Sequence, residues 1–395
     1  MNMISDTMLA RIKYVHSDKQ ALKTVSFAFL SSRVACFLFV YLGHSLRTWF
    51  NFPSTSGLFE GVANWWLNPW TTFDSKWFLS VAHQGYQPHT TPFFPLYPFL
   101  LKLGGDSEAG MALAGICISN ICFFLALYLL FRLTELELGL NVAKASVWLL
   151  AFYPTTAFFS AVYTESLFLL LLLLTFYSAR LRRWHTAGLC GLLAALTRNP
   201  GVLICLALSL AYLKSIDYDW RSIRFSALGS ITLPLCGLVL VQLYYWHLFD
   251  NPLIGIESQK YFFRSIGWPW RPVLADFENL VSLRYFGNMF FVSFLNLVTI
   301  GMTVILAIRY FKLVDLHYLV LIFGIISMNL VYQHVIPPYT AGSVRYMSTV
   351  FPFIQLLAIF CSTGWLARVK KAAGGVYFYV FLICSASFGM KSFLG

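Results

Sequence analysis

The chain has 395 residues, of which 58% are hydrophobic and only 11% are charged, and its formal net charge is +12. Soluble proteins carry about 25% charged residues, so this composition excludes a soluble globular domain and indicates a polytopic membrane protein. The excess of Lys and Arg is attributed to cytoplasmic loops, because no basic run interleaved with aromatics forms a nucleic-acid-binding stripe.

A membrane-spanning helix needs about 20 apolar residues, and the chain contains a series of such stretches. A polar, basic segment precedes the first of them, which favours a retained signal-anchor helix over a cleaved signal peptide. We expect one all-α domain over residues 1–395, with exterior loops at 45–108 and 249–285. The predicted spans cover residues 25–44, 109–130, 145–160, 165–177, 226–248, 286–308, 314–332, 347–364 and 376–388.

The segment 186–213 is either one kinked span or a hairpin of two short helices that turns inside the membrane, because Arg198, Asn199 and Pro200 interrupt it. A single crossing would place the later basic clusters outside, against the positive-inside rule. The charge distribution therefore favours the hairpin, about eleven helices in all, and an exterior C-terminus. A charge at the turn is costly in hydrocarbon, so Arg198 should face a protein cavity and a counter-charge.

The loop 45–108 contains the most unusual stretch of the chain. Asp74 is a lone carboxylate among aromatic residues, and it is followed by the prolines Pro88, Pro92, Pro95 and Pro98. Each proline removes a backbone donor and blocks the preceding helical turn, so the stretch is predicted to be a loop at the membrane surface, anchored by its aromatic rings.

Asp74 has two interpretations. It is either the general base that deprotonates an attacking hydroxyl, or a structural carboxylate that caps a short helix or pairs with Lys76. His83 lies in the same loop, and we expect both Lys76 and His83 to contact substrate. The spacing of histidines matches no metal signature, so we assign no metal site, although a divalent cation is not excluded.

Besides Asp74, three charged residues belong to the exterior half on this topology: Glu165, Arg198 and Arg345. Arg198 and Arg345 could each bind a phosphate through two hydrogen bonds. The structural alternative for Arg198 is a pair with Glu165, and the alternative for Arg345 is an anchor at the membrane interface. Glu165 opens a predicted span, where a carboxylate is also a favourable helix N-terminal residue. Asn199 and Tyr163, next to these residues in sequence, complete the predicted substrate-binding set.

At these residues the sequence resembles the PIG-V mannosyltransferases, a family of membrane-embedded GT-C glycosyltransferases. The resemblance is carried by four motifs in family order, and it departs mildly where Phe73 replaces the usual Trp and where the order of the Arg-x-Asn-Gly turn is altered. The motifs are residues 73–79 with Gly85-Tyr86 and 93–98, Tyr153-Pro154 with 163–168, 197–201, and Arg345-Tyr346 before Phe351-Pro352.

The resemblance implies a dolichyl- or polyprenyl-phosphate mannose donor, inversion at the sugar carbon, and Asp74 as the catalytic carboxylate. It leaves the acceptor (glycan, lipid or protein) open. The chain is short and has no Asn-x-Ser/Thr sequon, which favours a bacterial relative over the eukaryotic enzyme. We therefore expect a multi-pass protein of the plasma membrane if bacterial, or of the endoplasmic reticulum if eukaryotic. The alternative function is a transporter or flippase of lipid-linked sugars, although no internal repeat supports it.

Overall fold

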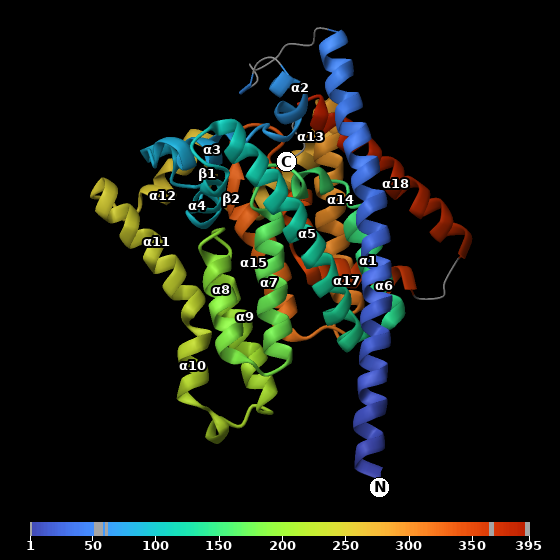
Figure 1. Cartoon of the computed structure of the whole chain (residues 1–395). Coiled ribbons are helices and arrows are strands. Elements are labelled where there is room, and N and C mark those ends of the chain that lie inside the picture. Colours follow the sequence, from blue (N-terminus) through green and yellow to red (C-terminus); the bar gives the residue numbers. More distant parts are fainter. Residues whose placement is uncertain (1, 51–57, 60–61, 363–366, 392–395) are drawn as a thin grey trace.

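The structure is a computed structural model that describes residues 2–50, 58–59, 62–362 and 367–391. Helices dominate these ranges (Figure 1), which confirms the all-α expectation. The short strands β1 (Arg264–Ile266) and β2 (Tyr332–His334) pair antiparallel, with Arg264 opposite His334. This pairing matters for the site, because it ties the second long loop to the end of the helix before β2.

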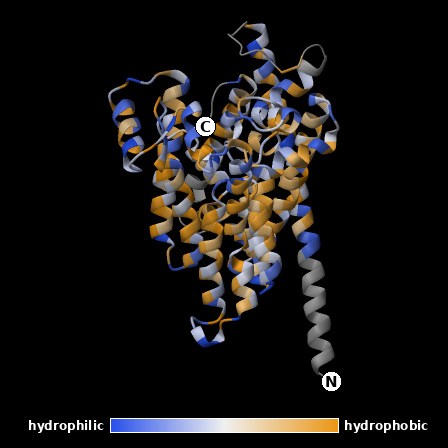
Figure 2. Ribbon diagram, turned by 90° about the vertical axis from the view of Figure 1, so that its left-hand side faces the viewer, coloured by the Kyte–Doolittle hydropathy of each residue, from blue (hydrophilic) through white to orange (hydrophobic). Residues whose placement is uncertain are grey.

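Several helices have the length and composition to cross a membrane, so the chain is a multi-pass membrane protein. Figure 2 shows apolar residues gathered midway along the bundle and hydrophilic residues at both ends. The longest apolar helices are Asp18–Trp49 of α1 (Asn2–Trp49), α5 (Glu108–Leu138) and α14 (Gly287–Arg309). A bent pair, α10 (Phe225–Ile231) and α11 (Leu233–Phe249), adds a fourth span if it is counted as one.

Shorter apolar helices fill the rest of the bundle. Their length leaves the number of crossings a matter of interpretation, so the count of about eleven stays a prediction. They are α6 (Leu140–Ala151), α7 (Glu165–Arg180), α8 (Trp184–Ala195), α9 (Gly201–Ser215), α15 (Leu316–Val331), α17 (Phe351–Ser362) and the apolar part Ala373–Gly389 of α18 (Ala367–Gly389).

Two predicted spans have different boundaries in the structure. The span expected at 145–160 ends at Ala151, because Pro154 follows and a short 3-10 turn, Thr156–Phe159, replaces its last part. The span expected at 347–364 begins at Phe351, and its first residues belong instead to α16 (Ser343–Ser348). Its last expected residue, Gly364, lies outside the described residues, as do 51–57 and 60–61 of the first loop.

The segment 186–213 forms an antiparallel hairpin, as predicted from the charge distribution. Helices α8 and α9 run in opposite directions and join at a turn that contains Arg198 (Figure 1). Gly188 of α8 lets α10 approach closely, because a Cβ there would lie 2.0 Å from the carbonyl oxygen of Ser230. The hairpin therefore packs between α7 and the bent pair α10 and α11.

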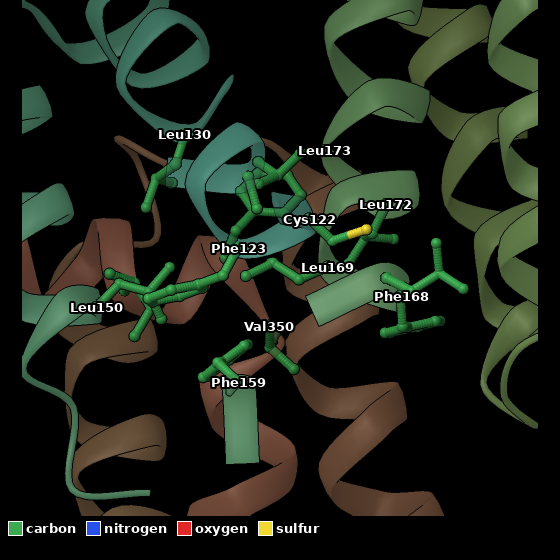
Figure 3. Packing of buried hydrophobic residues seen from close by; sticks show 14 of the residues in the cluster. Cys122, Phe123, Leu130, Leu150, Phe159, Phe168, Leu169, Leu172, Leu173 and Val350 are labelled. Carbon is green, nitrogen blue, oxygen red and sulfur yellow. The ribbon is translucent and has the colours of Figure 1, made fainter. Parts of the chain in front are cut away.

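The core lies where α5, α6, α7 and α17 meet. Figure 3 shows the side chains of α5 and α7 interdigitating, with Phe159 and Val350 beneath them. Phe123 and Phe159 stack with ring centroids 4.6 Å apart. This packing fixes the start of α7, which carries Glu165, against the segment that leads into α17.

Small surface helices lie at the end of the bundle opposite the N-terminus (Figure 1). They hold the aromatic loop over the upper end of the bundle in Figure 1. They are α2 (Val62–Leu67), α3 (Ser75–Gln84), α4 (Leu96–Leu101), α12 (Ile254–Glu257) and α13 (Trp270–Val281).

Candidate active site

Asp74 stands at the start of α3, at the exit of a strained turn. Phe73 has a left-handed φ of 54°, a conformation uncommon for non-glycine residues. The backbone N–H of Asp74 donates to the Tyr163 hydroxyl at 2.9 Å, and that hydroxyl donates to the carbonyl of Thr72 at 3.0 Å. Tyr163 therefore fixes the turn from behind and sets the direction of the Asp74 side chain.

The carboxylate of Asp74 takes neither of the structural roles considered for it. Asp74 occupies the N-cap position of α3, but its side chain makes no capping hydrogen bond. Lys76 lies over the ring of Trp77, 4.7 Å from its centroid, and does not pair with Asp74. Instead, Nη1 of Arg345 donates to Oδ2 of Asp74 at 2.9 Å.

Two carboxylates and two guanidiniums form one continuous network. Glu165, fully buried at the start of α7, accepts from Nε of Arg345 at 2.6 Å and pairs with Nη1 of Arg198 at 2.8 Å. Arg345 therefore bridges Asp74 and Glu165, and Arg198 closes the chain of alternating charges. Such a network balances its charges internally, as buried ions require.

Aromatic rings enclose both arginines. The guanidinium of Arg345 lies 4.7 Å from the ring centroid of Phe158 and 4.8 Å from that of Tyr163. Arg198 lies 5.0 Å from the ring of Tyr346. Ring faces attract cations, and rigid rings keep the two planar groups in fixed orientations.

A third arginine, which the sequence did not single out, joins the site from β1. Arg264 donates from Nη2 to the hydroxyl of Tyr346 at 3.3 Å and from Nη1 to the carbonyl of Tyr332 at 3.4 Å. Arg264 lay in a loop without a motif, and only the pairing of β1 with β2 brings it here. Tyr346 is thus surrounded by Arg198, Arg264 and Arg345.

These residues share a cavity of about 540 Å³. Its wall combines charged groups with aromatic and apolar ones, as binding sites for amphipathic ligands do. Its polar lining includes Asp74, Lys76, Arg198, Asn199, Arg264, His334, Arg345 and Tyr346. Of the other predicted residues, Glu165 and Tyr163 lie behind the cavity lining and hold its residues in place. His83 is exposed, lies 3.9 Å from Glu108 and is not part of the lining.

The surroundings set the charge states of groups at the cavity. Burial lowers the pKa of Arg345, but the carboxylates of Glu165 and Asp74 outweigh this and raise the pKa well above its usual value. Burial and the nearby Arg264 lower the pKa of His334 to about 3. Arg345 is therefore a permanent cation, and His334 is neutral at physiological pH.

The segment that carries Arg345 is held by buried polar side chains. Asp276 of α13, fully buried, accepts hydrogen bonds from the backbone N–H groups of Tyr339 and Thr340 at 3.1 and 2.9 Å. Asn296 of α14 accepts from the N–H of Val344 at 3.0 Å. The sequence offered no motif for Asp276, which lies within the predicted loop 249–285.

Within the described ranges, no group of three His, Cys, Asp or Glu side chains is placed to hold a metal ion. The carboxylates of the site face guanidinium groups instead. The arrangement can orient a carboxylate for proton transfer and can bind an anion with the arginines.

A model of the family described as Mannosyltransferase (PIG-V) matches residues 45–367, which is most of the chain. The chain belongs to the PIG-V mannosyltransferase family. The matched region contains Asp74, Glu165, Arg198, Arg264 and Arg345, so the whole network lies within the part that this family shares. No curated protein matches the sequence significantly.

Solved structures with a similar course of the chain include proteins from two organisms. An Archaeoglobus fulgidus oligosaccharyltransferase tethered to an acceptor peptide is 13% identical, with 95% of this chain and 55% of that one covered and a TM-score of 0.45. ArnT from Cupriavidus metallidurans bound to undecaprenyl phosphate is 12% identical, with 80% and 70% covered and a TM-score of 0.45. The chain therefore spans about half the length of the archaeal enzyme.

Proposed function

We propose that this PIG-V family protein is an inverting GT-C glycosyltransferase that moves mannose from a polyprenyl- or dolichyl-phosphate carrier to an acceptor hydroxyl at the exterior face of the membrane. One observation carries the proposal. A carboxylate, Asp74, and two arginines that can bind phosphate, Arg198 and Arg264, line one cavity at a single end of the helical bundle, together with Arg345, which holds Asp74. Family membership supports mannose as the transferred sugar.

Asp74 acts as the general base in this proposal. Arg345 holds Oδ2, and no described residue donates a hydrogen bond to Oδ1, so one oxygen is oriented and the other is available for a proton. The acceptor oxygen forms a bond to the anomeric carbon while the bond from that carbon to the phosphate oxygen breaks. The proton of the hydroxyl passes to Asp74, and the phosphate leaves with the bonding electron pair.

Arg198 and Arg264 bind the phosphate of the carrier. Their guanidiniums stand around Tyr346, at distances of 5.0 and 5.8 Å from its ring centroid, and both line the cavity. Positive charge fixed at this point stabilises the oxyanion that develops as the glycosidic bond breaks. Arg345, already engaged by two carboxylates, has a positioning role for Asp74.

The positive-inside rule supports the exterior location of the site. The basic residues that follow α7 and α9 lie at the lower end in Figure 1, opposite α3 and β1. Cytoplasmic loops carry an excess of Lys and Arg, which supports a cytoplasmic location for the lower end and an exterior location for Asp74.

A transfer assay with purified, reconstituted protein and polyprenyl-phosphate mannose tests the proposal. Asp74→Asn should reduce turnover by about 10²–10⁴-fold while leaving donor binding intact. Asp106→Asn, which removes an exposed carboxylate of the same exterior loop outside the cavity lining, is the matched control. Turnover that Asp74→Asn leaves unchanged would refute the role of Asp74. Movement of the donor across vesicles without transfer would support the flippase instead.

A further inference from the structure

A second cavity of about 390 Å³ lies at the opposite end of the bundle from Asp74. It opens where α5, α7 and α9 end and where α15 begins, at the lower end of the bundle in Figure 1. The positive-inside rule places this end at the cytoplasmic leaflet. Nothing in the proposed transfer reaction uses it.

The charged groups of this cavity form separate pairs, with one cation left over. Glu137 accepts a hydrogen bond from the Tyr318 hydroxyl at 2.8 Å and lies 3.9 Å from Nε of Arg180. Lys214 pairs with Asp315. Among the described residues no carboxylate pairs with Arg182, which also lines the cavity. The balance of formal charge inside the cavity is therefore positive.

Helix-end chemistry explains two of these cations but not the third. Arg180 and Lys214 lie in the last turns of α7 and α9, where a cation complements the partial negative charge of the helix C-terminus. Arg182 lies beyond the last turn of α7, in a left-handed conformation with φ 56°. It is available to a ligand from outside the helix.

The remaining wall is apolar, with Leu138, Phe176 and Leu313 among its residues. A free inorganic anion makes no use of such a surface, whereas a phospholipid presents a phosphate joined to an apolar body. Basic pockets between transmembrane helices on the cytoplasmic side bind anionic headgroups by this combination. We propose that this cavity binds the phosphate headgroup of an anionic phospholipid of the inner leaflet through Arg182 and Arg180, with Lys214 at its rim.

The test is lipid binding by the full chain in neutral detergent micelles at about 0.15 M salt, where long-range attraction between exposed charges is screened. Phosphatidylglycerol should bind more tightly than phosphatidylcholine. Arg180→Gln with Arg182→Gln should weaken phosphatidylglycerol binding by about tenfold or more. The matched control, Arg221→Gln with Arg224→Gln, removes two exposed cations that do not line the cavity and should change binding less than twofold.

Arg182→Gln alone keeps the test valid if the double variant does not fold, because Arg182 has no carboxylate partner among the described residues. Arg182→Gln should also weaken the binding of phosphatidylglycerol. The proposal would be overturned if the control double variant lost as much phosphatidylglycerol binding as Arg180→Gln with Arg182→Gln. It would also be overturned if the wild type bound both lipids with equal affinity. Displacement of bound lipid by millimolar inorganic phosphate would also overturn it and would identify free phosphate as the ligand.

Discussion

The two cavities use the same residue types in opposite ways. At the upper end of the bundle in Figure 1, Arg345 contacts two carboxylates at once within a buried network. At the lower end, each acid has its own base with an exposed side chain, Arg180 for Glu137 and Lys214 for Asp315. A buried network that loses one member leaves another charge unbalanced, whereas an exposed cation can exchange its partner for solvent or a ligand. The upper site is therefore suited to hold a fixed geometry, and the lower one to accept a ligand.

Arg345→Gln should have the largest effect, because it breaks the network around Asp74 and Glu165. It removes the only described cation that contacts Asp74 and one of two that contact Glu165. Breaking a buried pair in this way typically costs ~3–5 kcal/mol of stability. Thermal unfolding in detergent measures the loss. Arg345→Lys keeps the charge without the two-point geometry, so it should recover part of the stability and little of the transfer activity. Wild-type stability in Arg345→Gln would contradict the network.

Asp276→Asn tests the support of the segment that carries Arg345. The carboxylate of Asp276 accepts the two backbone N–H groups on its two oxygens, whereas the amide of Asn has one acceptor oxygen. The N–H of Tyr339 or Thr340 therefore loses its partner, at a cost of ~1–3 kcal/mol. Both unfolding temperature and turnover should fall. Glu278→Gln, an exposed neighbour on the same helix, should change neither. Equal effects of the two substitutions would mean that Asp276 has no special role.

Arg264→Gln separates phosphate binding from proton transfer. Loss of a charge-assisted contact should weaken donor binding by about tenfold to a hundredfold, with a smaller effect on turnover at saturating donor. Arg271→Gln removes an exposed arginine outside the cavity lining and serves as the control. Titration of donor binding checks the prediction, and unchanged affinity in Arg264→Gln would remove this residue from the phosphate site.

His334, which lines the cavity with Asp74, should make the stability of the protein depend on pH. Its pKa is about 3 in the folded chain, because of burial and Arg264, against ~6.5 in an unfolded one. The unfolded state therefore binds more protons between these values, and stability falls as pH decreases through about 6.5. Unfolding temperatures measured from pH 7 to pH 5 should fall less in His334→Gln than in the wild type. Parallel curves would show that His334 does not contribute.

Lys214→Gln together with Asp315→Asn should have the smallest effect. Both side chains are substantially exposed, and exposed ion pairs contribute ~0–1 kcal/mol. The unfolding temperature should therefore stay near that of the wild type. A loss as large as that of Arg345→Gln would erase the contrast between the two ends.

The sequence predicted the features that local chemistry determines. Asp74 and the prolines Pro88 to Pro98 singled out the loop that contributes to the cavity, and the distribution of Lys and Arg favoured the hairpin that the structure shows. The end of α6 and the start of α17 differ from the predicted spans. Pro154 and Pro352 mark these two positions, but a span length of ~20 apolar residues runs past both prolines.

Contacts between distant segments could not be read in this way. Asp74 and Arg345 are 271 residues apart, and Arg264 enters the cavity only through the pairing of two three-residue strands. His83 lies close to Asp74 in sequence, yet α3 carries it to the exposed side, beside Glu108. Only the packing of the whole chain decides which polar residues of a loop face the cavity.

The most direct test compares three proteins: the wild type, Asp74→Asn, and the double variant Arg198→Gln with Arg264→Gln. Donor affinity and single-turnover transfer are measured on the same preparation of each. The account predicts that Asp74→Asn binds polyprenyl-phosphate mannose like the wild type but does not transfer the sugar, whereas the double arginine variant loses donor affinity. Transfer by Asp74→Asn at the wild-type rate, or unchanged donor affinity without Arg198 and Arg264, would contradict a single site in which a carboxylate and a phosphate-binding pair act together.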